Sequence, residues 1–205
     1  MKTLLIIDIQ HDFVPNGALA VTEGDTIIPI VNALQAHFEH IVATQDWHPR
    51  AHKSFAANHT GEDIGNVIEL NGLLQVLWPV HCVQNNKGAE FVTSLDMSRV
   101  ARIFQKGTDI EIDSYSGFFD NGQRKSTGLG DYLHSVGTTE VYIVGLATDY
   151  CVKYSALDAV SLGFTTYLVE DACKGVNLQA NDVSKAIAEM REAGVRIVQS
   201  KNISS

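Results

Sequence analysis

The chain has 205 residues, of which 45% are hydrophobic and 19% charged, an ordinary composition for a soluble globular protein. This length corresponds to one domain, and we expect residues 1–205 to form a single unit that buries its core without disulfide bonds. The 15 Lys and Arg against 24 Asp and Glu give a net charge of −9, which argues against nucleic acids and anionic membranes as partners.

The start of the chain shows no targeting signal. No apolar run is long enough to cross a bilayer, and the apolar stretch after Met1 is interrupted by Asp8, too early for a signal peptide. We therefore expect a cytosolic protein, whose three cysteines are core thiols or a nucleophile rather than a disulfide framework. The sequence leaves the oligomeric state open, a homo-oligomer included.

Short apolar runs that do not alternate with polar residues are typical of strands buried on both faces. They comprise residues 4–7, 41–43, 100–104, 141–144, 165–169 and 195–198. Between most of them, apolar residues three or four positions apart predict helices over residues 27–38, 149–162 and 181–193. The alternation predicts an α/β fold with three layers, αβα, around a six-stranded, mostly parallel sheet with helices on both faces. By fold analogy, the expected strand order is 3-2-1-4-5-6.

The stretch from about residue 49 to residue 87 interrupts this alternation. It carries two prolines and the histidines His52, His59 and His81, and its only helical pattern is a weak one near residues 67–77. A long, poorly periodic insertion in a compact domain is usually functional, and a solvated excursion is the alternative.

Polar residues follow the predicted strands directly. Asp8 follows the first strand, Asp46 and His48 the second, Lys106 the third, and Cys151 lies where a helix is expected after the fourth. Because ligands of open parallel sheets bind beyond the carboxyl ends of the strands, these residues are the candidates for a site.

Cys151 has the setting of a nucleophile. Gly145 and Ala147 allow a tight turn before it, and Thr148 or Asp149 is placed to cap the following helix. The positive end of that helix favours a thiolate, and its free N–H groups suit an oxyanion. A buried structural cysteine is the alternative.

The other two cysteines fit that structural alternative better. Cys82 lies in the apolar segment Pro-Val-His-Cys-Val, and Cys173 follows the fifth predicted strand, away from any helix start. We therefore expect both to be ordinary core thiols.

Asp8 and Lys106 form the second candidate pair. A carboxylate at the end of a buried strand has a raised pKa and can act as a base, with Lys106 as its countercharge. Together with Cys151 they make a plausible nucleophile, base and electrostatic set. A purely structural ion pair is the alternative.

The segment Asp46-Trp47-His48 indicates a metal site, since residues two apart in an extended segment point to the same side. His81, beyond the insertion, is the best third ligand, and His52 is the next. Such a set suits one divalent metal ion, zinc in the first place, with iron or manganese as alternatives. The aromatic residues Phe13, Trp78 and Tyr115 could line a flat pocket for a planar ring, although ordinary packing is the commoner fate of such side chains.

Seven segments, spread over nearly the whole chain, carry these candidates. They are Ile7-Asp8-Ile9-Gln10-His11-Asp12-Phe13, Thr44-Gln45-Asp46-Trp47-His48-Pro49, His52-Lys53-Ser54-Phe55, Trp78-Pro79-Val80-His81-Cys82-Val83, Lys106-Gly107, Tyr115-Ser116-Gly117-Phe118 and Gly145-Leu146-Ala147-Thr148-Asp149-Tyr150-Cys151-Val152. Together they resemble the nicotinamidase/pyrazinamidase family within the isochorismatase-like cysteine hydrolases. The metal motifs separate this family from the isochorismatases and carbamoyl amidases of the same superfamily.

The resemblance implies a catalytic triad of Asp8, Lys106 and Cys151. It also implies a cis peptide between Leu146 and Ala147, and an oxyanion hole made by the backbone N–H groups of Ala147 and Cys151.

The remaining implied roles concern the metal and the substrate. The implied metal ligands are Asp46, His48 and His81, with water in the other positions, and His52 stays undecided. The implied ring-packing residues are Phe13, Leu19, Trp78 and Tyr115. Tyr150 is assigned no chemistry.

The implied reaction is the hydrolysis of nicotinamide to nicotinate and ammonia through a cysteine thioester, in NAD salvage, with pyrazinamide as a further substrate. The partner is thus a small pyridine carboxamide, whose ring nitrogen binds the metal while its carboxamide meets Cys151.

Three alternatives remain at this point. The first is a hydrolase whose metal activates the attacking water while Cys151 merely packs. The second is a related amidohydrolase that acts on another small amide or carbamoyl substrate. The third is a metal-binding module without activity, which would not need Lys106 and Cys151 at strand ends.

Overall fold

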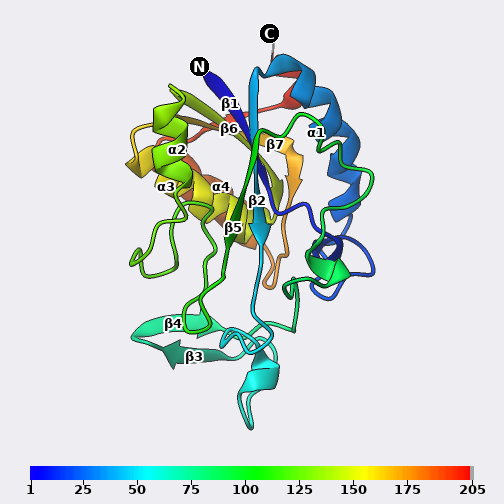
Figure 1. The fold of residues 1–205 in the computed structure, drawn as a ribbon, viewed down its shortest axis with the longest axis vertical. Helices are drawn as coiled ribbons and strands as arrows, with labels where there is room; N and C mark the ends of the chain where they lie inside the picture. Colours follow the sequence, from blue (N-terminus) through cyan, green and yellow to red (C-terminus); the bar gives the residue numbers. More distant parts are fainter. Residues whose placement is uncertain (204–205) are drawn as a thin grey trace.

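The computed structural model describes residues 1–203, and its centre is one sheet of six parallel strands (Figure 1). The strands are β1 (Lys2–Ile7), β2 (His40–Asp46), β5 (Arg102–Lys106), β6 (Glu140–Leu146), β7 (Thr165–Lys174) and β8 (Arg196–Val198). They lie in the order β5-β2-β1-β6-β7-β8. Numbered within this sheet alone, the order is 3-2-1-4-5-6, so the expected topology is confirmed.

Helices cover both faces of the sheet, as the unbroken apolar strands predicted (Figure 1). They are α1 (Ile28–Leu34), α2 (Leu129–Ser135), α3 (Lys153–Ser161) and α4 (Asp182–Glu192). On β1, Leu4 and Ile6 belong to the core cluster that includes the buried side of α1. Leu5 and Ile7 face the other way, into the cluster formed with α2, α3 and α4. Both sets are fully buried, which explains why residues 4–7 of β1 form an unbroken apolar run.

The boundaries of two expected helices differ in the structure, and one further helix, α2, was not predicted. The expected helix over residues 149–162 begins as a π-helical turn, Thr148–Val152, and continues as α3. The pattern over residues 27–38 becomes a short α1 with a 3-10 turn on each side, Gly24–Ile27 and Gln35–His37, which keeps Ile27 and Phe38 in the core. Helix α2 has only seven residues, too few for the sequence to show a periodic pattern. By contrast, α4 lies within the expected range.

The weak helix expected near residues 67–77 is wrong, because this part of the insertion is an antiparallel hairpin. It consists of β3 (Val67–Leu70) and β4 (Leu73–Val76), and it lies beyond the carboxyl end of β2 (Figure 1). Asn71 and Gly72 both have a positive φ, 53° and 80°, as a two-residue hairpin turn requires. The Asn-Gly pair between two apolar runs was the sequence signal for this hairpin.

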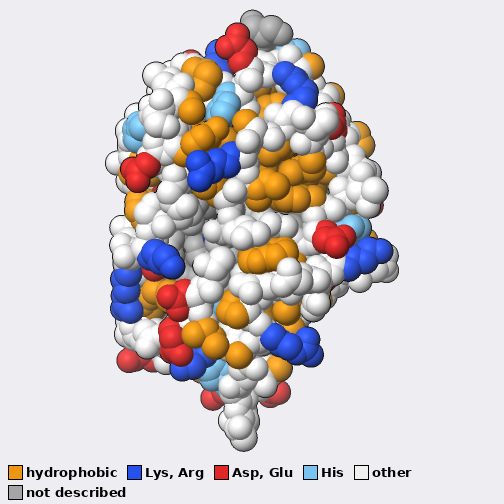
Figure 2. All heavy atoms as spheres, viewed as in Figure 1, with side chains coloured by type: hydrophobic (Ala, Val, Ile, Leu, Met, Phe, Trp, Pro, Cys, Tyr) orange, Lys and Arg blue, Asp and Glu red, His pale blue; other side chains and the backbone are white. Residues whose placement is uncertain are grey.

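Charged side chains of both signs lie on one face of the molecule (Figure 2). On the face shown in Figure 2, lysine and arginine side chains lie among acidic ones rather than in one basic patch. Among residues 1–203, no helix combines the length and the apolarity that crossing a bilayer would require.

Strand β6 approaches β1 closely at Gly145, near the end of β6. Its φ is +121°, and a Cβ at this position would overlap the backbone of Ile7 on β1. We expect Gly145→Ala to lower the free energy of unfolding by at least about 2 kcal/mol, measured from urea midpoints.

Gly163→Ala is the matched control, because Gly163 also has a positive φ, +86°, but nothing lies within 4 Å of an added Cβ. This substitution should cost only about 1 kcal/mol. Equal losses in both variants would show that the β1–β6 approach adds no constraint at Gly145.

Candidate active site and metal centre

The carboxyl ends of four adjacent strands carry the residues that the sequence singled out. Asp8 follows β1 directly, Asp46 ends β2 and Lys106 ends β5. Cys151 lies in a π-helical turn, Thr148–Val152, between β6 and α3. Because β5, β2, β1 and β6 are adjacent and parallel, these residues meet at one edge of the sheet.

Lys106 is the centre of this group. Its Nζ lies 3.0 Å from Asp8 Oδ2, 2.5 Å from Asp46 Oδ1 and 3.3 Å from Cys151 Sγ. It also donates a hydrogen bond of 2.9 Å to the carbonyl of Ser114. Burial alone would lower the pKa of Lys106, but the charges of Asp46 and Asp8 raise it well above its usual value. The ammonium group therefore stays charged although it is buried.

The two carboxylates beside Lys106 have opposite pKa shifts. Burial raises the pKa of Asp8, even though Lys106 and a 2.6 Å hydrogen bond from Thr44 Oγ1 oppose the shift. Burial also acts to raise the pKa of Asp46, but Lys106 and His48 lower it well below its usual range. Asp8 is thus the carboxylate suited to take up a proton, while Asp46 stays ionised.

The thiol of Cys151 does not have the lowered pKa that its expected place at a helix start suggested. Burial raises its pKa well above the usual value, the charges of Asp8 and Asp46 add to this, and Lys106 opposes it. Burial near two carboxylates thus opposes the thiolate that the expected helix start favours. A buried thiol of this kind needs a base, and Asp8 and Cys151 offer atoms within 4.8 Å of each other.

The three predicted metal ligands come together on the other side of Asp46. The Nε2 atoms of His48 and His81 lie 3.4 and 3.7 Å from Asp46 Oδ2, and all three side chains are buried. The Nδ1 atoms lie 2.8 Å from the carbonyls of Gly107 and Pro79. Since a carbonyl only accepts, each Nδ1 carries a proton, and each Nε2 points towards Asp46. This arrangement fits a divalent metal ion.

His52, which the sequence left undecided, lies beside this cluster but outside it. Its ring is 4.5 Å from that of His48, and its Nδ1 is 2.7 Å from Ser54 Oγ. It groups with His48 and Asp113 rather than with Asp46 and His81. Burial lowers the pKa of His52 to about 4, so its ring is neutral.

A cavity joins the two halves of the site, and it contains all four predicted ring-packing residues. It is lined by Phe13, Leu19, Asp46, Trp78, His81, Asp113, Tyr115, Ala147, Tyr150, Cys151 and Val176. The rings of Trp78 and Tyr150 meet edge to face at 4.9 Å, and Trp78 Nε1 donates a 3.2 Å hydrogen bond to the Tyr115 hydroxyl. Two candidate metal ligands, an aromatic wall and a thiol thus share one cavity.

Three lining residues had no role in the sequence-based prediction. Asp113 lies two positions before Tyr115, and its carboxylate accepts a 3.2 Å hydrogen bond from Gln75 on the hairpin. Tyr150 directly precedes Cys151, so its position next to the nucleophile was a usable signal. Val176 has no such signal, because tertiary contacts bring it to the cavity.

Those contacts come from Asp149, and they correct its expected role as a helix cap. Its two carboxylate oxygens accept hydrogen bonds from the backbone N–H groups of Val176 and Asn177, at 2.9 and 2.7 Å. Neither Thr148 nor Asp149 makes a capping hydrogen bond at the turn that holds Cys151. The peptide between Leu146 and Ala147 is cis, as expected.

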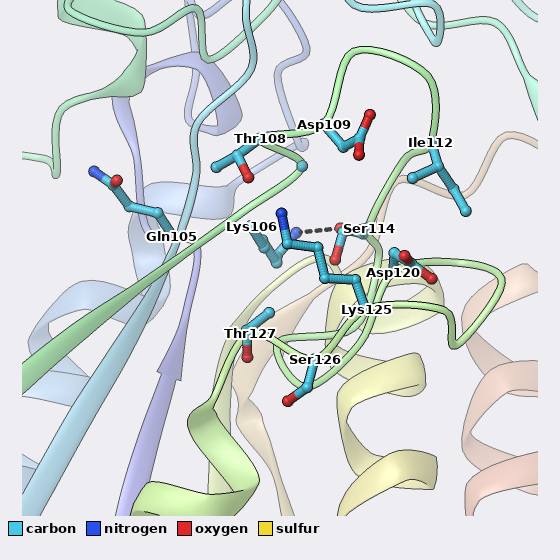
Figure 3. A pocket seen from close by; sticks show the side chains of 11 residues that line it. Gln105, Lys106, Thr108, Asp109, Ile112, Ser114, Asp120, Lys125, Ser126 and Thr127 are labelled. Atoms are coloured by element: carbon cyan, nitrogen blue, oxygen red, sulfur yellow. Dashed lines mark hydrogen bonds between the residues drawn. The ribbon is translucent and has the colours of Figure 1, made fainter.

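A separate polar cavity at the end of β5 is shown in Figure 3. Its lining includes Thr108, Asp109, Asp120, Lys125, Ser126 and Thr127. Lys106 and Ser114 also border it, and the hydrogen bond between them is the dashed line in Figure 3. Because the Lys106 side chain has no exposed surface, this cavity does not open onto the charged group of the site.

Comparison with known proteins places the chain in a family of hydrolases. The isochorismatase domain profile matches residues 2–202. The chain therefore belongs to the isochorismatase family.

Within that family, its similarity is to nicotinamidases. The nicotinamidase of Escherichia coli is 44% identical over 200 residues, which cover 96% of this chain and 93% of that protein. The structure of an Acinetobacter baumannii nicotinamidase/pyrazinamidase is 46% identical, with a TM-score of 0.96 over 98% of this chain and 97% of that one. A pyrazinamidase from Pyrococcus horikoshii, solved in complex with zinc, is 42% identical, with a TM-score of 0.79 over 97% and 98%.

Replacing Lys106 with Met removes the charge between two buried carboxylates. We expect Lys106→Met to lower the free energy of unfolding at pH 7 by about 3–5 kcal/mol. A group whose pKa is raised in the folded state, such as Asp8, adds stability at low pH, and this contribution disappears as the pH rises. A group whose pKa is lowered in the folded state, such as Asp46, adds stability at high pH, and this contribution disappears as the pH falls. Without Lys106 the pKa of both carboxyls should rise, so the deficit should shrink from pH 7 towards pH 5 in urea titrations.

Lys174→Met is the control, because Lys174 makes an exposed ion pair of 2.9 Å with Glu23. It should cost at most about 1 kcal/mol, with little dependence on pH over the same range. A Lys106→Met deficit that stays constant or grows on acidification would contradict the assigned charges.

Proposed function

We propose that this protein is a nicotinamidase, which hydrolyses nicotinamide to nicotinate and ammonia and also accepts pyrazinamide. The observation that carries this proposal is the position of Lys106. Its ammonium group touches the sulfur of Cys151 and the carboxylate of Asp8, and it also binds Asp46, which faces two histidines. Asp46, one of these histidines and Cys151 line the same cavity. A nucleophile set and a candidate metal centre therefore lie next to each other at a cavity lined by aromatic rings.

In the proposed mechanism Asp8 moves the protons and Cys151 forms the covalent bond. Asp8 takes the thiol proton, and Lys106 stabilises the resulting thiolate. The sulfur attacks the carboxamide carbon, the C–N bond breaks, and the leaving nitrogen takes the proton from Asp8 and departs as ammonia. Asp8 then deprotonates a water molecule that attacks the thioester. The C–S bond breaks, nicotinate is released and the thiol regains its proton.

The backbone and the cavity wall complete this assignment. We assign the backbone N–H groups of Ala147 and Cys151 to the oxyanion of the tetrahedral intermediates, which is consistent with their place in the cavity lining. The ring-packing residues are Phe13, Leu19, Trp78 and Tyr115. Their aromatic and aliphatic side chains hold a planar ring at a fixed angle to the sulfur.

Asp46, His48 and His81 would hold one divalent metal ion, and we assign zinc to the site because one carboxylate and two imidazoles are typical zinc ligands. The ion would supply a Lewis acid for the ring nitrogen of the substrate. The protein's part is to keep Nδ1 of both histidines bonded to carbonyls, so that each ring keeps its orientation. We further propose that residues 1–205 form a single domain, with residues 49–87 as an insertion that contributes His81.

Cys151→Ala tests the covalent mechanism. We expect hydrolysis of nicotinamide, measured as ammonia release, to fall to background, because no other side chain in the cavity can form the thioester. The metal content of the variant should be unchanged, since the sulfur is not one of the three proposed ligands.

Cys173→Ala is the matched control, because Cys173 is a buried thiol whose pKa is raised to about 12 by burial. This variant should keep its activity. Activity retained by Cys151→Ala would instead support the alternative in which a metal-bound water attacks.

Removal of the metal tests the other half of the site. We expect a chelator to abolish turnover and added Zn²⁺ to restore it, while the far-ultraviolet circular dichroism stays unchanged because the sheet does not depend on the site. In His81→Ala, zinc should not restore turnover at the same concentration. Full turnover in chelator-treated, metal-free protein would sink the metal assignment but leave the thioester mechanism intact.

A further inference from the structure

The segment that follows β1 carries two polar side chains for which the mechanism has no use. Gln10 and Asp12 lie between Asp8, the proposed base, and Phe13 in the cavity wall. Gln10 is completely buried, and Asp12 is partly buried. Both side chains bind backbone groups of the segments that carry the proposed metal ligands.

Gln10 holds the peptide groups of Asp46 from both sides. Its Nε2 donates to the Asp46 carbonyl at 2.8 Å, and its Oε1 accepts from the Asp46 N–H at 2.8 Å. The second proton of Nε2 goes to the Ala89 carbonyl, also at 2.8 Å. Both protons of Nε2 and the oxygen of the Gln10 amide thus have a hydrogen-bond partner, which fixes the orientation of the amide. Because Asp46 must reach Lys106 with one oxygen and two histidines with the other, a small movement of its backbone would break one set of contacts.

Asp12 acts on the segment of His81 in a similar way. Its Oδ2 accepts a 2.7 Å hydrogen bond from the N–H of Cys82, the residue after His81, and its Oδ1 accepts from Ala18 N–H at 3.2 Å. Cys82 has a φ of +44°, which is uncommon for a residue with a side chain. The carboxylate therefore stabilises an unfavourable backbone conformation.

The peptide of Cys82 also reaches the second histidine. Its carbonyl accepts a 3.0 Å hydrogen bond from the N–H of His48. One chain of hydrogen bonds thus runs from Asp12 through Cys82 to His48, and it passes the attachment point of His81. The Asp12 carbonyl in turn accepts from Leu19 N–H at 3.0 Å, which ties the ring wall to the same residue.

From these contacts we propose that Gln10 and Asp12 are positioning residues that hold Asp46, His48 and His81 in ligand geometry before a metal ion binds. This inference rests on the proposed function in so far as the three residues bind a metal. Neither side chain touches substrate or the reacting atoms. Their effect is on metal affinity, because a site that must first be assembled by the ion binds that ion more weakly.

The test is the zinc affinity of purified variants, measured by competition with a chelator of known affinity. We expect Asp12→Ala to weaken zinc binding by about 10-fold to 100-fold, the range seen when outer partners of ligands are removed. Asp12→Asn should lose less, since its remaining oxygen can still accept from Cys82 N–H. Gln10→Leu should weaken zinc binding at least about 10-fold, provided that it folds.

A merely structural role has a different signature in thermal unfolding. We expect the rise in Tm on adding Zn²⁺ to be smaller in the variants than in the wild type, since stabilisation by a bound ion follows its affinity. If Gln10 and Asp12 served only general stability, the Tm of the metal-free form would fall while the zinc affinity stayed at the wild-type value. That result would overturn the proposal.

Two control variants carry equivalent changes outside the site. Gln35 is a buried glutamine whose Nε2 donates a 2.8 Å hydrogen bond to the Asp96 carbonyl. Asp171 binds the N–H and hydroxyl of Ser200 with its two oxygens. Gln35→Leu and Asp171→Asn should keep the zinc affinity of the wild type.

The outcomes separate this inference from the function on which it rests. If the wild-type protein itself takes up no Zn²⁺ at this site, the metal assignment fails first. If the wild type binds zinc and the Asp12 and Gln10 variants bind it equally well, only the positioning role is overturned.

Discussion

One buried cation holds the site together. Lys106 has no exposed surface, so its charge is tolerable only if carboxylates meet it at short range, and Asp8 and Asp46 do so. Each partner stands at the end of a different strand, which means that β5, β2 and β1 must end level with one another. The parallel register that brings Asp46 opposite Lys106 meets this requirement. In this position the same ammonium group also contacts the sulfur of Cys151.

Asp46 links the nucleophile to the candidate metal centre. One of its oxygens binds Lys106 and the other faces Nε2 of His48 and His81. The two halves of the site therefore share one carboxylate, which also lines the cavity. This explains why so much of the hydrogen bonding around β1 and β2 goes to backbone groups near Asp46 rather than to the cavity itself.

Much of this arrangement was predictable from the sequence for a simple reason. The centres of strands buried on both faces are apolar runs, so the charged residue that follows within a few positions of each run marks a strand end, and Asp8, Asp46 and Lys106 were found in this way. The prediction of secondary structure failed where the fold depends on a turn rather than on a periodic pattern of apolar residues. The hairpin over residues 67–76 depends on the Asn71-Gly72 turn, and its strands of four residues each are too short to show a clear strand period.

The sequence by itself determined the positions of the six strands of the sheet, the identity of the strand-end residues and their resemblance to a family of amidases, because these depend on local composition and on short motifs. Only the tertiary structure decided their electrostatic state. The raised pKa of Cys151, the opposite pKa shifts of Asp8 and Asp46, and the turn of Asp149 towards Val176 all depend on burial and on charges from distant segments. Such effects act through space over a few ångströms, and neighbours in space are not neighbours in the chain.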